Sequence, residues 1–84
     1  MRVLLVEDNI LHMTLLKEQI MNFGIQDSNI ACTFDGLEAV KLMENNIIEK
    51  NEDSEQMLFS LIITDYCVPC VSGLEIMKKA ERLF

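Results

Sequence analysis

Residues 61–73 read LIITDYCVPCVSG, and the fold prediction depends on this stretch. Leu61, Ile62 and Ile63 are consecutive large aliphatic residues, a pattern typical of a strand covered on both faces inside a parallel sheet. Asp65 then lies at the carboxyl end of that strand. In open α/β sheets the functional crevice lies outside the carboxyl ends of the strands. Asp65 is therefore the best candidate for a functional residue.

A second apolar run, from Val3 to Val6, ends on the acidic pair Glu7 and Asp8. If the two predicted strands are neighbours, these two acids and Asp65 converge in one crevice. Their mutual repulsion would then be costly without a cation. Magnesium prefers oxygen ligands and binds best where phosphate oxygens complete its shell. The cluster thus favours phosphoryl chemistry, in which one carboxylate acts as a nucleophile and forms an aspartyl phosphate.

The residues between these strands predict two helices and one weaker strand. Asn9 can cap a first helix that stops at Gly24, and a strand is expected within residues 28–33. Asp35 and Glu38 have the spacing of a capping box that opens a second helix. The expected inward-facing residues of the two helices are Met13, Leu16, Ile20 and Phe23 in the first, and Ala39, Val40, Met43 and Ile47 in the second.

Residues 44–56 are rich in acids, and we expect most of them to form a solvated loop or a frayed helix end. After the 61–64 strand, Ser72 caps a last helix with Leu74, Met77 and Ala80 on its inner side. Strands and helices therefore alternate throughout residues 1–84. This order predicts an α/β fold, with one parallel sheet wound by right-handed crossovers, in a single domain or part of one.

Composition limits the possible partners. The chain has 84 residues, 50% of them hydrophobic, and 14 acidic against 7 basic residues give a formal net charge of −7. This charge argues against direct binding to nucleic acid or to an anionic membrane. No apolar run approaches the roughly 20 residues of a membrane span, and acids interrupt the amino-terminal run where a signal peptide would continue. We expect a cytoplasmic, intracellular protein whose three cysteines are reduced.

Cys67 and Cys70 form a C-x-x-C pair that invites a zinc or redox interpretation. A zinc site needs four ligands, so Cys32 and His12 would have to be recruited from a strand and a helix. A thioredoxin-like pair would lie at the start of its helix, where Ser72 stands instead. The simpler interpretation is that these are turn or core thiols.

Three segments and two single residues together resemble the receiver domain of two-component response regulators or hybrid histidine kinases. They are residues 3–9 (VLLVEDN), 36–39 (GLEA) and 61–65 (LIITD), with Pro69 and Gly73 four and eight residues after the aspartate. The resemblance extends from Arg2 to Phe84. It implies a flavodoxin-like fold with the first strand central, next to the third.

Carried over residue by residue, the resemblance makes Asp65 the phosphoacceptor and Asp8 a direct Mg²⁺ ligand. Glu7 becomes the second acid, which often acts through water, and Cys67 offers its backbone carbonyl to the metal. The implied phosphoryl donor is a histidine kinase or a histidine phosphotransfer protein. The implied role is that of a phosphoacceptor and not of an enzyme, beyond self-phosphorylation and self-dephosphorylation.

Receivers also carry a Ser or Thr after a fourth strand and a Lys after a fifth, and neither position falls within these 84 residues. Without those strands and helices, the Leu61 strand becomes an open apolar edge, and the sheet face beside the first helix lacks a second cover. We therefore expect the isolated chain to be marginal in stability, prone to aggregation, or completed by another chain or by oligomerisation through this edge. The alternative function is a phosphorylation-silent receiver fragment that acts only as a protein-interaction module. A magnesium-dependent hydrolase would need a general acid or a substrate pocket, which the sequence does not reveal.

Overall fold

The computed structural model describes residues 1–65 and 72–84, which form three parallel strands and three α-helices. The strands are β1 (Arg2–Val6), β2 (Ile30–Thr33) and β3 (Phe59–Thr64). The helices are α1 (Ile10–Asn22), α2 (Gly36–Glu52) and α3 (Gly73–Leu83), with a short 3-10 turn, Asp27–Asn29, before β2. The expected α/β alternation is confirmed, and this is the architecture of the first three strand–helix units of a flavodoxin-like receiver fold.

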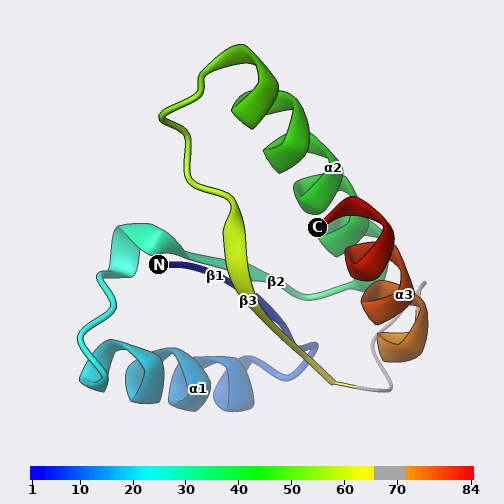
Figure 1. The fold of residues 1–84 in the computed structure, drawn as a ribbon. Coiled ribbons are helices and arrows are strands. Elements are labelled where there is room, and N and C mark those ends of the chain that lie inside the picture. The colour runs from blue at the N-terminus through cyan, green and yellow to red at the C-terminus, as the bar shows by residue number, and fades with distance from the viewer. Residues whose placement is uncertain (66–71) are drawn as a thin grey trace.

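The sheet has the order β2-β1-β3, so the first strand is central, as expected. Helix α1 lies on one face of the sheet, and α2 and α3 lie together on the other (Figure 1). Val3 to Val6 are at most 1% exposed, because helices cover both faces of β1. Val3 and Leu5 pack on the α1 side, and Leu4 and Val6 pack on the α2 and α3 side.

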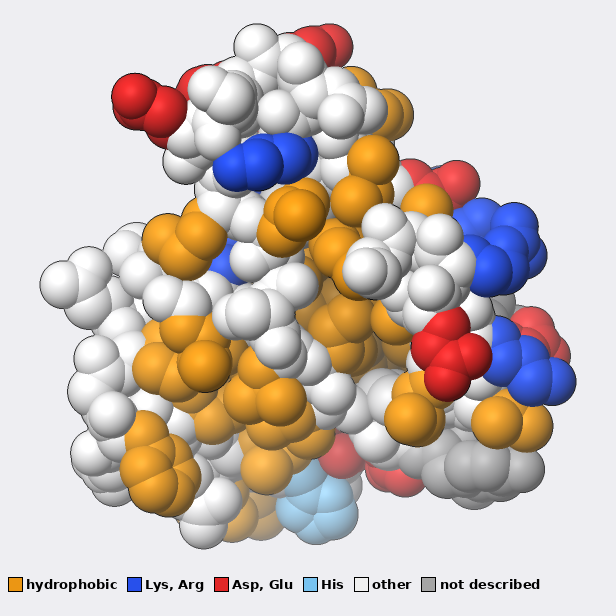
Figure 2. Space-filling model, in the orientation of Figure 1, with side chains coloured by type: hydrophobic (Ala, Val, Ile, Leu, Met, Phe, Trp, Pro, Cys, Tyr) orange, Lys and Arg blue, Asp and Glu red, His pale blue; other side chains and the backbone are white. Residues whose placement is uncertain are grey.

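β3 occupies an edge of this sheet, and its side chains are less covered than the sequence predicts. Leu61 is 39% exposed, and Ile62 and Ile63 are half-buried. The prediction of a strand covered on both faces is therefore wrong within the described residues, whereas the open apolar edge is confirmed. Figure 2 shows hydrophobic side chains gathered on the face of the molecule where β3 lies in front.

The second helix is longer than the sequence predicts. α2 continues to Glu52, so the expectation of a solvated loop or a frayed helix end over residues 44–56 is wrong for all but the last four of them. Asp53 ends the helix, and its N–H still donates to the Glu49 carbonyl at 2.8 Å. Acidic composition misled the prediction because Glu and Lys are good helix formers, and a solvated helix face is as polar as a loop.

Two predicted apolar stripes need correction. In α1, Met13 and Ile20 are buried, but Phe23 is 88% exposed beyond the helix end. In α3, Leu74 and Met77 are 47% and 59% exposed. The residues of α3 that contact the core are Ile76, Ala80 and Leu83. Helical spacing alone does not say which of two neighbouring stripes meets the sheet, because that depends on how α3 packs against α2.

The residues predicted to begin and end the helices are confirmed in these roles. The side chains of Asn9, Asp35 and Ser72 each accept hydrogen bonds from backbone N–H groups in the first turn of the helix that follows. Gly24 lies just after α1 with φ +97°, the left-handed conformation expected of a glycine stop.

We expect Gly24→Ala to lower the free energy of unfolding by about 1 kcal/mol. No atom lies within 4 Å of the added Cβ, so the cost arises from the left-handed backbone alone. Gly24→Asn is the matched control, because asparagine tolerates this conformation better. Thermal melting followed by circular dichroism measures both. Equal midpoints for the wild type and the alanine variant would contradict the assignment of strain.

Candidate functional site

Two neighbouring strands end at the same edge of the sheet and place three acids there. Glu7 and Asp8 directly follow β1, and Asp65 directly follows β3. Val6 and Thr64 are paired in the parallel register, and the Asp65 N–H donates to the Val6 carbonyl at 3.0 Å. On the other side, the Glu7 N–H donates to the Thr33 carbonyl of β2 at 3.1 Å. Backbone pairing therefore sets the positions of both strand ends.

Glu7, Asp8 and Asp65 each place a carboxylate oxygen within 4.8 Å of the others. The sequence predicted this convergence on condition that β1 and β3 are neighbours, and the structure meets that condition. Glu7 is buried at 7% exposure, whereas Asp8 and Asp65 are exposed. Three carboxylates at this spacing repel one another, and a bound cation relieves the repulsion. Hard oxygen donors on a partly open edge suit Mg²⁺, which keeps several waters when bound.

The start of α1 supports the buried acid. The Asn9 N–H donates to Glu7 Oε1 at 3.1 Å, and Asn9 Oδ1 accepts from the N–H groups of Leu11 and His12 at 2.9 and 3.1 Å. His12 Nδ1 lies 3.9 Å from Glu7 Oε1. One turn of chain thus orients Glu7 and caps the helix at once. Asp8 lies in the chain between Glu7 and the cap residue Asn9.

The remaining predicted ligand is not placed. Cys67, whose backbone carbonyl was expected to bind the metal, lies outside the described residues, as do Pro69 and Cys70. Cys32 is half-buried on β2, and burial raises the pKa of its thiol; nearby Asp27 acts in the same direction and Lys17 opposes it. Within residues 1–65 and 72–84, the three acids form the only group of three or more His, Cys, Asp or Glu side chains close enough to share an ion.

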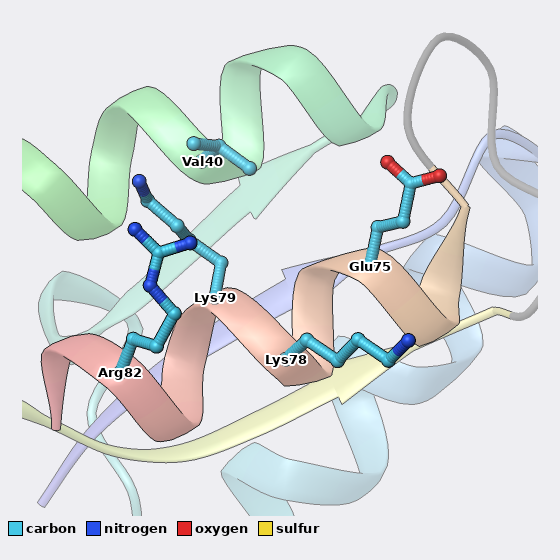
Figure 3. Close-up of a pocket in the computed structure, with 5 residues that line it drawn as sticks. All are labelled: Val40, Glu75, Lys78, Lys79 and Arg82. Carbon is cyan, nitrogen blue, oxygen red and sulfur yellow. The ribbon is translucent and has the colours of Figure 1, made fainter.

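A separate hollow lies between α2 and α3, away from the acids. It encloses about 330 Å³ and is lined by Val40 of α2 and by Glu75, Lys78, Lys79 and Arg82 of α3 (Figure 3). Lys79 Nζ is 3.7 Å from Glu44 across the two helices. None of the three clustered carboxylates contributes to this hollow, so it is distinct from the candidate metal site.

Sequence reasoning missed one polar residue in the core. Asn46 of α2 is 2% exposed, and its side chain binds the backbone at the start of β3. Its position three residues after Met43 continues the buried stripe of α2. A polar residue at such a position is the signal that could have identified it.

Comparison with curated proteins finds a two-component response regulator of Arabidopsis thaliana, ARR17. It is 30% identical over 83 residues, which are 98% of this chain and 52% of that protein. This similarity supports a receiver domain. The chain spans about half the length of this relative. No family model matches the present chain, and no solved structure matches it.

The similarity thus supports a receiver domain of the kind found in two-component signalling. Among the described residues, no helix combines the length and the apolar character that a membrane span requires.

Proposed function

We propose that this receiver is a phosphoacceptor module of a two-component phosphorelay, in which Asp65 takes a phosphoryl group from a phosphohistidine of a partner protein. The observation that carries the proposal is the convergence of three carboxylates within 4.8 Å at adjoining strand ends. Its partner is a histidine kinase or a histidine phosphotransfer protein. The three cysteines and the chain's acidity favour a cytoplasmic setting without direct contact to nucleic acid or membrane.

Burial divides the roles among the acids. Glu7 is enclosed and bound by the Asn9 N–H, so it is poorly placed to meet a second protein. Asp65 is exposed at the end of the edge strand, where a bulky phosphohistidine can approach. Asp8, Asp65 and Glu7 are the side chains that would hold Mg²⁺, together with the backbone carbonyl of Cys67.

The transfer balances as a simple displacement. A carboxylate oxygen of Asp65 forms a bond to phosphorus while the bond from phosphorus to the imidazole nitrogen breaks. The departing nitrogen keeps the electron pair and takes a proton from solvent. When bound, Mg²⁺ neutralises the charge of the phosphoryl oxygens. The chain's own contribution is to fix Asp65 beside Asp8 and Glu7. In this proposal the chain is not an enzyme, beyond its own phosphorylation and dephosphorylation.

Phosphorylation by a small donor tests this proposal. We expect incubation with Mg²⁺ and acetyl phosphate to add the mass of one phosphoryl group, removable by base, and Asp65→Asn to abolish the gain. Asp53→Asn is the matched control, since Asp53 is exposed at the end of α2, outside the acidic cluster. A folded sample without any mass gain, or an Asp65→Asn variant that still gains mass, would refute phosphorylation at Asp65.

A second candidate function is supported by the open apolar face. A hollow of about 460 Å³ beside α1 is lined by Met1, Ile20, Phe23, Ile25, Leu61 and Ile63. Met1 and Phe23 are 61% and 88% exposed. A receiver that only docks on another protein would use such a surface. It would bind its partner equally well with and without Asp65→Asn, and it would gain no mass from acetyl phosphate.

A further inference from the structure

A buried amide joins α2 to the beginning of β3. Asn46 Nδ2 donates to the Met57 carbonyl at 3.1 Å, and Asn46 Oδ1 accepts from the Phe59 N–H at 2.8 Å. In a strand, the carbonyl of one residue and the N–H of the residue two further on point to the same side. The side chain of Asn46 therefore pairs with Met57, two residues before β3, and with Phe59, its first residue, much as a neighbouring strand would.

β3 is irregular immediately after this contact. Phe59 pairs with Arg2, but Leu61 pairs with Val3, so Ser60 is an extra residue in β3. Phe59 and Ile62 both contact the core between the sheet and α2, although they are three residues apart. Regular alternation would send residues three apart to opposite faces. The bulge at Ser60 is what lets both side chains reach the same core.

We infer that Asn46 is a positioning residue for the acidic site, because it fixes the register in which β3 delivers Asp65. Holding Phe59 on the core side obliges the bulge to fall at Ser60, and the remaining residues of β3 then pair one for one up to Val6 and Thr64. A slip of one residue exchanges the faces of every side chain in a strand. The carboxylate of Asp65 would then leave Glu7 and Asp8.

Arg2 contributes to the same junction from β1. Its Nη1 donates to the Met57 carbonyl at 3.3 Å, and its guanidinium lies 4.8 Å from the centre of the Phe59 ring. These contacts are at the partly exposed end of the strand, whereas Asn46 is enclosed. The amide of Asn46 is the stronger constraint, since its hydrogen bond with the Phe59 N–H is buried and its bond to the Met57 carbonyl is partly buried.

The inference rests on the proposed function and is tested on the full 84-residue chain by Mg²⁺ titration and by nuclear magnetic resonance. We expect Asn46→Leu, at a temperature where it is folded, to weaken Mg²⁺ binding at least tenfold and to shift the Asp65 amide resonance. Asn45→Leu, at the exposed neighbouring position, is the matched control and should change neither. Ile30→Ala, in the α1-side core, controls for lost stability and should lower the melting midpoint without weakening Mg²⁺ binding.

Each outcome decides the inference. If Asn46→Leu melts earlier but binds Mg²⁺ as the wild type does, Asn46 is structural only and the inference is overturned. If the wild type binds no Mg²⁺, the proposed metal role fails. The positioning role of Asn46 is then decided by the Asp65 amide resonance alone: a shift in Asn46→Leu supports that role, and an unchanged resonance overturns it.

Should Asn46→Leu fail to fold, hydrogen exchange in the wild type replaces it. We expect the Phe59 amide to be protected as strongly as the Asp65 amide, which donates to Val6. Rapid exchange at Phe59 alongside slow exchange at Asp65 would overturn the inference, because the register would then hold without the Asn46 contact.

Discussion

Replacing Leu4 with alanine is expected to lower the free energy of unfolding by about 3 kcal/mol, the largest loss from any single change considered. Leu4 is fully buried in the central strand and packs in the core formed with α2 and α3. Small domains have a stability of only about 5–15 kcal/mol. One buried leucine therefore accounts for a large share of the stability of this chain.

Urea unfolding followed by circular dichroism measures this loss as a lower midpoint. Leu37→Ala is the matched control, because Leu37 is 48% exposed on α2 and its truncation should change the stability by about 0.5 kcal/mol or less. Equal midpoints for the two variants would contradict the burial of Leu4. The same experiment on the wild type tests the expectation that the isolated chain is marginally stable or aggregates, which stays a prediction.

The second large effect concerns Asp8→Asn, whose stability relative to the wild type is expected to change sign when Mg²⁺ is added. Without metal, Asp8→Asn is expected to raise the free energy of unfolding by up to about 1 kcal/mol, the Coulomb energy of two unit charges 4 Å apart in water. The physical reason is that Asp8 lies within 4.8 Å of two other carboxylates. With Mg²⁺ at a hundred times its dissociation constant, the wild type gains about 2.7 kcal/mol and the variant gains much less. The order of the two melting midpoints is thus expected to reverse as Mg²⁺ is added.

Thermal melting across a Mg²⁺ series checks this reversal. Asp53→Asn serves as the control for charge removal away from the cluster, and it should track the wild type at every Mg²⁺ concentration. Equal stabilisation of the wild type and Asp8→Asn by Mg²⁺ would show that Asp8 is not a ligand. The test is independent of phosphorylation, so it separates metal binding from phosphoryl transfer.

The features predicted correctly from the sequence depend on short stretches of chain. Asn9, Asp35 and Ser72 cap their helices because each side chain bonds to N–H groups only two or three residues ahead. Gly24 ends α1 in a left-handed backbone conformation, which glycine adopts at little cost and other residues adopt only with strain. The continuous apolar run from Val3 to Val6 predicted a buried strand, and the central place of β1 was implied by the resemblance to receiver domains.

The errors arose where the outcome depends on packing between distant elements. α3 packs through Ile76 and not through Leu74 or Met77, because its approach to α2 chooses between two adjacent stripes. α2 continues through the acidic stretch to Glu52, and one side chain in that stretch, Asn46, is buried against β3. Hydropathy treats that asparagine as solvent-exposed. Its value as a backbone partner appears only when the two elements are brought together.

By itself, the sequence determined that acids follow two apolar strands, and that Asp65 is the one associated with the residues 61–73 pattern. Tertiary structure alone decided that these acids meet, since the order β2-β1-β3 sets β1 beside β3 and the bulge at Ser60 aligns Val6 with Thr64. The physical reason is that a strand's side chains alternate with a period of two, so a single-residue difference in pairing decides which face each one occupies. Local sequence carries the chemistry of each carboxylate, and the pairing of distant strands determines whether they form one site.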